Sequence, residues 1–243
     1  MIPKIIHYCW FGGTPLPKSA KKCIASWKKF LPDYEIKEWN ESNFNVNIIP
    51  YTAEAYQAKK YAFVSDYARF WILNQFGGLY FDTDVEVISS FDDIIEKGSF
   101  MGFEDNDDGC YSVNPGLGMG SECNMDFLNH ILSIYEHKSF SFDRNMDNVV
   151  ILTTNELVNE GLNRNNKFQH VIGFNIYSTN FFCPLSMLNG NFTKDQFTHS
   201  IHRYDGSWLS KKQKRAMYIK MHYGEKIFKI LCKIQKLIRF HSL

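Results

Sequence analysis

The sequence predicts an α/β fold, an open sheet with parallel strands that is flanked by helices. Patterns typical of strands and of helices alternate over the first 140 residues, which favours a sheet with parallel members. The chain has 243 residues, of which 44% are apolar and 16% aromatic, so it can bury a substantial core. Most of the chain is therefore expected to form one domain.

The first three expected elements are a strand, a helix and a second strand. Residues 4–10 form a short apolar segment that stops before Gly12 and Gly13. Residues 17–30 begin with the proline that is favoured at the start of a helix. Residues 34–39 alternate in polarity as a strand does.

The later elements continue the alternation. Residues 53–76 are expected to form one long helix, which the glycines at 77 and 78 end. A strand over residues 79–88 follows it directly. The remaining expectations are a strand over 99–104, a helix over 123–137, no clear order over 138–195, a short strand over 201–204 and a helical pattern in the basic tail.

Two carboxylates interrupt the apolar strand expected after the glycine pair, in the segment LYFDTDVEV. In a regular strand Asp82 and Asp84 would point to the same side, where they repel each other unless a cation lies beside them. Mg²⁺ and Mn²⁺ are commonly held by one or two carboxylates together with substrate phosphates. Ligands of open α/β sheets bind beyond the carboxyl ends of strands. The motif therefore favours a cation that binds a diphosphate, and an exposed acidic turn is the alternative.

The preceding helix carries a charged pair among apolar neighbours. Asp66 and Arg69 are three residues apart and lie on one helical face. An arginine in so apolar a helix can hold a phosphate, and an aspartate can accept hydrogen bonds from sugar hydroxyls. The alternative is a local salt bridge with no ligand.

The first strand and a late segment supply further candidates. Trp10 could stack on a nucleobase, and the glycines after it allow a ligand close to the backbone. Residues 198–208 contain two histidines, and neutral imidazole can bind Mn²⁺. Taken alone, the first strand is more simply core and a single histidine is more often structural.

Three segments together resemble the DxD-containing glycosyltransferases of family 32: IPKIIHYCWFGG, YAFVSDYARFWILNQFGGLYFDTDV and IHRYDGSW, in this order. They cover residues 1–104 and about 199–208, and the middle one is long and specific. The resemblance implies a GT-A fold, a nucleotide-diphosphosugar donor, a divalent cation (Mn²⁺, or Mg²⁺) and retention of anomeric configuration. The catalytic domains of clostridial glucosylating toxins are more distant relatives.

The resemblance also implies roles for individual residues. Asp82, Asp84 and His202 are the expected metal ligands. Asp84, Arg69 and Asp66 are the expected catalytic residues. The donor contacts that the resemblance implies are His7, Trp10, Asp66, Arg69, Asp82, Asn114, Ser207 and Trp208.

The function implied is transfer of a hexose from a UDP-sugar, or a GDP-sugar, to a glycan acceptor. A lipid-linked acceptor in bacterial capsule or O-antigen synthesis is expected, with residues 1–208 as the catalytic domain. Residues 209–243 contain ten Lys or Arg and one Glu, spaced as a basic amphipathic helix. This helix is expected to lie on an anionic membrane surface, and packing on the domain is the alternative.

Composition limits the other possibilities. The six cysteines lack zinc-like spacing, and the start lacks a secretory signal, so a cytoplasmic protein with reduced thiols is expected, peripheral at most on the inner face of the plasma membrane. A net charge of +1 does not favour nucleic-acid binding. A haloacid-dehalogenase-like phosphatase shares the DxD pattern, but Glu86 stands where that family has Thr or Val. A non-catalytic sugar-binding module is the third possibility.

Overall fold

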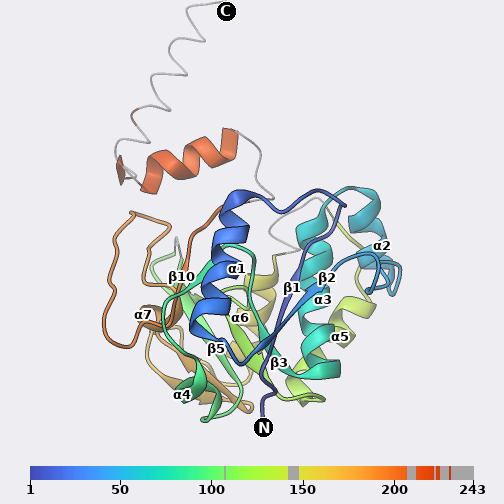
Figure 1. The fold of residues 1–243 in the computed structure, drawn as a ribbon, viewed down its shortest axis with the longest axis horizontal. Coiled ribbons are helices and arrows are strands. Elements are labelled where there is room, and N and C mark those ends of the chain that lie inside the picture. The colour runs from blue at the N-terminus through green and yellow to red at the C-terminus, as the bar shows by residue number, and fades with distance from the viewer. Residues whose placement is uncertain (107, 142–147, 207–211, 222, 225–229, 231–243) are drawn as a thin grey trace, which may run out of the picture.

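The computed structural model describes residues 1–106, 108–141, 148–206, 212–221, 223–224 and 230. Its centre is an eight-stranded sheet in the order β2-β1-β3-β7-β5-β9-β8, with β6 paired to β5 (Figure 1). The strands are β1 (Ile5–Cys9), β2 (Glu35–Trp39), β3 (Gly78–Tyr80), β5 (Phe100–Asp105), β6 (Tyr111–Val113), β7 (Met119–Ser121), β8 (Gln169–Val171) and β9 (Phe174–Tyr177).

The sheet is mixed. Strand β1 is parallel to both β2 and β3, and β5 is parallel to β9, whereas β7 runs antiparallel to its two neighbours. The predicted α/β class is confirmed. A second sheet of two antiparallel strands, β4 (Val85–Val87) and β10 (Ser200–His202), lies beside the large one.

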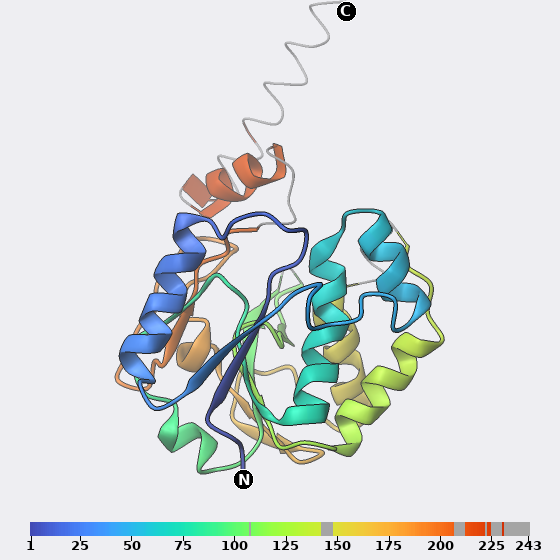
Figure 2. The same ribbon diagram turned by 45° about the vertical axis from the view of Figure 1, so that its right-hand side comes forward.

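Helices cover both faces of the large sheet, α1 on one side and α3 and α5 on the other (Figure 2). Successive residues of β5 face opposite sides, so Phe100 packs in one buried apolar cluster and Met101 in the other. The helices are α1 (Lys18–Phe30), α2 (Pro50–Gln57), α3 (Tyr61–Phe76), α4 (Asp92–Ile95), α5 (Asp126–Glu136), α6 (Val149–Asn159) and α7 (Thr179–Phe182).

Two expected elements are wrong in a way that matters for the site. The helix predicted over 53–76 is two helices, α2 and α3, because Lys59 between them adopts a left-handed conformation (φ 55°). The strand predicted over 79–88 is also two strands, β3 and β4, which belong to different sheets. Gly77 and Gly78 do end α3, with φ of 62° and 100°.

A buried histidine fastens the end of α3 to the sheet. His7 on β1 is 1% exposed, and its Nδ1 accepts a hydrogen bond from Trp39 Nε1 at 3.0 Å. Its Nε2 therefore carries the proton and donates to the carbonyl oxygen of Gly77, also at 3.0 Å. Burial lowers the pKa of His7 to about 4, so the ring is neutral near pH 7.

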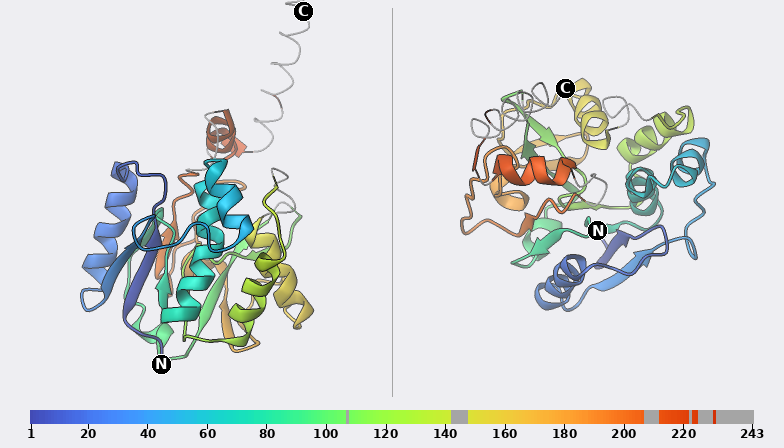
Figure 3. Two further views of the ribbon diagram at one scale, coloured as in Figure 1. Left: turned by 90° about the vertical axis from the view of Figure 1, so that its right-hand side faces the viewer. Right: turned by 90° about the horizontal axis from the view of Figure 1, so that it is seen from above.

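The described part of the basic tail crosses one end of the domain. Residues 212–221 are helical and lie at the end opposite the N-terminus (Figures 1 and 3). Met217 and Met221 pack against the apolar cluster on the α1 side. Most of the amphipathic pattern, from Ile227 onward, lies outside the described residues except for Ile230. Among the helices that the structure describes, none is both long and apolar enough to cross a bilayer.

Candidate donor and metal site

The DxD motif occupies the turn where the chain passes from the large sheet to the small one. Residues 81–84 link β3 to β4, and the backbone N–H of Val85 donates to the carbonyl oxygen of Asp82 at 3.0 Å. Because the chain turns here, the expectation of one regular strand that aims both carboxylates the same way is wrong. The turn follows the carboxyl end of β3, beside the carboxyl end of parallel β1, where ligands of open α/β sheets bind.

Asp82 is tied to α3 through a buried arginine. Arg69 is 4% exposed, and its Nη2 lies 3.1 Å from Asp82 Oδ1 and 3.0 Å from Asp66 Oδ1. Burial raises the pKa of Asp82, and the positive charge of Arg69 offsets part of that rise. The structure therefore brings together three of the predicted site residues, Asp66, Arg69 and Asp82, as one compensated charge cluster.

Asp84 faces the second sheet. Its Oδ1 lies 3.2 Å from His202 Nε2, and its Oδ2 accepts a hydrogen bond from the backbone N–H of Asp205 at 3.0 Å. Burial alone would raise the pKa of Asp84, but the charge of His202 and these hydrogen bonds hold it below its usual value. The predicted pairing of a late histidine with the DxD motif is thus present, across the β4–β10 ladder.

His202 also lies beside two residues that the sequence analysis missed. One ligand atom each from Glu104, Cys183 and His202 lie within 4.8 Å of one another. Burial raises the pKa of Glu104 to about 7, although Asn114 Nδ2 donates to its Oε2 at 2.8 Å. Glu104 stands at the end of an apolar strand, a position that could have been read from the sequence, but nothing local points to Cys183.

The donor atoms around the turn fit a divalent cation. The Nδ1 atom of His202 is buried and has no hydrogen-bond partner among the described residues, which is costly for a polar atom. Carboxylates and an imidazole suit Mn²⁺ or Mg²⁺ by their chemistry. Among the described residues, however, the ligand atoms that lie within 4.8 Å of one another belong to Glu104, Cys183 and His202, and not to Asp82, Asp84 and His202. Without a cation, burial lowers the pKa of His202, but the Asp84 carboxylate outweighs burial and raises it well above its usual value.

Asn114 and Gly116 belong to a loop that packs directly against Asp82, called here the Gly116 wall. Asn114 Oδ1 accepts a hydrogen bond from the N–H of Gly116 at 2.7 Å, and Asp82 N–H donates to the carbonyl oxygen of Gly116 at 3.1 Å. A Cβ atom at Gly116 would lie 2.0 Å from Asp82 Oδ2, so only glycine allows this approach. Asn114 thus orients Glu104 and the Gly116 loop together.

The remaining predicted donor contacts have different surroundings. Trp10 is half-buried at the carboxyl end of β1, and its Nε1 donates to the carbonyl oxygen of Thr14 at 2.6 Å. His7 lies in the interior, with both ring nitrogens bonded to other parts of the protein. Ser207 and Trp208 lie outside the described residues.

Part of the chain is similar in sequence to known glycosyltransferases. Residues 17–101 match the family described as glycosyltransferase sugar-binding region containing DXD motif. An uncharacterized glycosyltransferase L373 of Acanthamoeba polyphaga mimivirus is 32% identical over 107 residues, which are 42% of this chain and 43% of the relative. The chain therefore aligns with less than half of that relative's length.

Solved structures share the fold at low identity. A glycosyltransferase involved in the glycosylation of the major capsid of PBCV-1 matches 89% of this chain and 100% of its own, with 14% identity and a TM-score of 0.51. The PaToxG glycosyltransferase matches 66% of this chain and 70% of its own, with 20% identity and the same TM-score. The fold is therefore the GT-A type. Over residues 17–101 the chain is also similar to DxD-containing glycosyltransferases, and this region includes the DxD turn.

Proposed function

We propose that the protein transfers a hexose from a nucleotide-diphosphate sugar, with a UDP-sugar favoured, to a glycan acceptor, with metal dependence and retention of configuration. The observation that carries the proposal is the DxD turn. It joins Asp84 to His202 on one side and Asp82 to Arg69 and Asp66 on the other. Few structural roles need so many compensated charges at the carboxyl ends of parallel strands.

Transfer of a sugar leaves growing negative charge on the diphosphate. A divalent cation held by Asp82, Asp84 and His202 would supply the opposite charge beside that leaving group. Arg69 adds a permanent positive charge next to Asp82, where it also fixes the carboxylate. Asp66 is proposed to accept hydrogen bonds from hydroxyls of the donor sugar, and Trp10, Ser207 and Trp208 remain proposed donor contacts.

Retention is proposed to proceed on one face of the donor sugar. The acceptor hydroxyl attacks from the side that the diphosphate leaves, and a β-phosphate oxygen takes its proton. The C1–O bond to the diphosphate breaks as the new glycosidic bond forms. Asp82 and Asp84 are engaged with Arg69 and His202, so neither is proposed as a covalent nucleophile.

The decisive experiment is a donor-hydrolysis and transfer screen with Mn²⁺ and a panel of nucleotide sugars. We expect UDP release from at least one UDP-sugar, lost in excess EDTA, and a product with the donor's anomeric configuration by NMR. Undiminished release in EDTA contradicts the metal, and inversion contradicts retention. Phosphate release without transfer would favour the phosphatase, and binding without turnover would favour the sugar-binding module.

The acceptor and location are proposed from the basic tail. Ten Lys or Arg and one Glu over residues 209–243 favour attraction to an anionic bilayer, at about 1 kcal/mol for each cation near the surface. A lipid-linked glycan of capsule or O-antigen synthesis at the inner leaflet is the proposed acceptor. Sedimentation with anionic liposomes should carry down the full chain more than a version that ends at Lys220. Equal, negligible pelleting of both contradicts the membrane role.

A further inference from the structure

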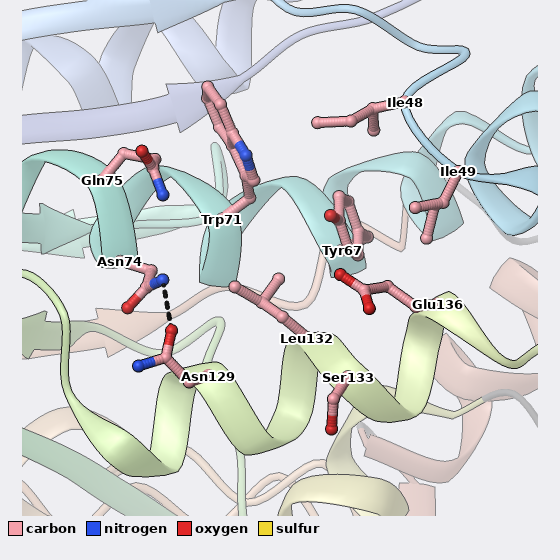
Figure 4. Close-up of a pocket in the computed structure, with 10 residues that line it drawn as sticks. All are labelled: Ile48, Ile49, Tyr67, Trp71, Asn74, Gln75, Asn129, Leu132, Ser133 and Glu136. Carbon is pink, nitrogen blue, oxygen red and sulfur yellow. Dashed lines mark hydrogen bonds between the residues drawn. The ribbon is translucent and has the colours of Figure 1, made fainter.

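A cavity lies away from the DxD turn, between α3, α5 and the segment that precedes α2. It has a volume of about 460 Å³, within the range of small-molecule sites. Figure 4 shows Asn74, Gln75 and Asn129 at one end and Tyr67 and Glu136 at the other. The proposed donor and metal residues do not line it, so this cavity is not part of the donor site.

The DxD turn and the cavity lie against different faces of helix α3. Each residue turns an α-helix by about 100°. Asp66 and Arg69 therefore share one face, whereas Tyr67, Trp71 and Asn74 lie on the opposite side. Arg69 meets Asp82 on the first face, and the Nδ2 atom of Asn74 donates to Asn129 Oδ1 on α5 at 2.8 Å on the second.

The lining of the cavity has a consistent chemistry. Trp71 offers a partly exposed indole, and Leu132 adds an apolar floor. Around them lie the amides of Asn74, Gln75 and Asn129, the hydroxyl of Ser133 and the carboxylate of Glu136. An amide both donates and accepts, so paired amides suit neighbouring hydroxyl groups, and an aromatic plane suits the apolar face of a sugar ring.

The charges of the lining residues limit which ligands the cavity can bind. Among the described residues that line the cavity there is no Lys or Arg, and Glu136 is the one ionisable carboxylate. A phosphate or an acidic sugar would meet no positive charge and would be repelled by Glu136. Burial and the negative charge of Glu136 raise the pKa of Tyr67 to about 12, so its hydroxyl stays protonated. The cavity thus offers neutral donors and acceptors with one negative charge.

The geometry points to a second glycan-binding subsite, in which a neutral pyranose lies against Trp71 and bonds to the amides of Gln75 and Asn129. The natural occupant, which rests on the proposed function, is a sugar unit of the acceptor glycan remote from the unit being extended. Two contacts on one glycan raise the local concentration of its reacting end without any new contact at the donor site.

The test is saturation-transfer difference NMR on the full chain in EDTA, which excludes metal-dependent binding at the DxD turn. The probes are the methyl glycosides of glucose, galactose, mannose and N-acetylglucosamine. We expect at least one to bind. Ser133→Trp, which fills the cavity from an exposed position, should weaken that binding at least tenfold. Gln75→Ala should weaken it about two- to tenfold, the value of a single hydrogen bond.

Two controls locate the binding. Asn155→Trp places the same bulk on an exposed position of α6 outside the cavity and should leave binding unchanged, as should Asp84→Asn. Thermal unfolding of each variant checks that it is folded. Binding of none of the four sugars, full binding by a folded Ser133→Trp, or loss on Asp84→Asn each overturns the subsite. Sugar binding without any nucleotide-sugar turnover would instead keep the subsite and remove the proposed reaction.

Discussion

The two faces of α3 serve the molecule in different ways. On one face Arg69 is 4% exposed and is held between Asp66 and Asp82, so each charge depends on its partners. On the other face Tyr67, Trp71 and their neighbours line a cavity in which Glu136 is the one charged carboxylate among the described residues. A buried charge is fixed by compensation, whereas a mostly neutral cavity is fixed by packing. Loss of a single charge on the first face should therefore lower stability and turnover strongly, whereas a single substitution on the second face should not.

The largest loss of stability should come from replacing Arg69, the cation at the centre of the charged face of α3. Arg69→Met leaves Asp66 and Asp82 without their shared cation, and breaking a buried ion pair commonly costs 3 kcal/mol or more. Because the Asp82 side chain is 30% exposed, we expect a loss of about 3 kcal/mol in unfolding free energy by urea denaturation. Loss of donor hydrolysis should accompany it.

An exposed arginine gives the matched control. Arg203 pairs with Glu86, and its side chain is 42% exposed. Arg203→Met should cost less than about 1 kcal/mol, as surface pairs do. Equal costs for the two variants would show that burial does not set the strength of the charged face.

The next effect concerns turnover. Asp84→Asn removes the charge that faces His202 and keeps the side-chain shape. We expect donor hydrolysis to fall by about 10²–10³, the usual value of one electrostatic contact in catalysis. Asp108→Asn, at an exposed carboxylate that pairs with Arg164, should leave the rate unchanged. Activity above about a tenth of the wild-type rate would contradict a catalytic role for Asp84.

A smaller effect should follow from displacing Asp82 without changing its charge. A Cβ at Gly116 would overlap Asp82 Oδ2, so Gly116→Ala must move that carboxylate. A displacement near 1 Å can lower the rate on the order of 10². Gly109→Ala meets no neighbour, although Gly109 has a φ of 78°, so it should lower stability and spare turnover. Unchanged kcat/KM in Gly116→Ala would contradict the role of this wall.

The smallest effect on stability at neutral pH should come from His7. This residue holds the C-terminal end of α3 through its hydrogen bond to Gly77. The native pKa of about 4 lies below the unfolded value near 6.5, so the unfolded state binds the proton first. Stability should therefore fall as the pH drops from 6.5 to 4, by about 1.4 kcal/mol per pH unit in this window. His7→Gln should flatten the profile from chemical denaturation at several pH values. Parallel profiles for the two proteins would contradict this assignment.

The local patterns of the sequence predicted most of the fold. Proline at the start of α1 and the glycine pair after α3 are signals contained within a few residues, so α1 lies close to where it was expected and α3 ends at the expected residue. The break at Lys59 was missed because the apolar periodicity continues through it. The order of residues 138–195 was missed because α6, β8 and β9 depend on distant partners, such as the pairing of β9 with β5.

The sequence marked candidate residues better than it marked their arrangement. The fold does bring Asp66, Arg69 and Asp82 together and places Asp84 beside His202, and their functional roles stay predictions. The turn between two sheets could not be read from LYFDTDVEV, since strand pairing decides where a short apolar segment divides. Glu104 and Cys183 join His202 only through the folded structure.

The pairing of β4 with β10 joins two segments that leave the ribosome at different times. All strands of the large sheet lie within residues 5–177, whereas β10 begins at Ser200. During synthesis the N-terminal residues leave the ribosome first. The residues of the large sheet therefore emerge before His202, and Asp84 lacks this partner until residue 202 has been added. A nascent chain thus holds the residues of the scaffold before it holds both sides of the proposed donor site.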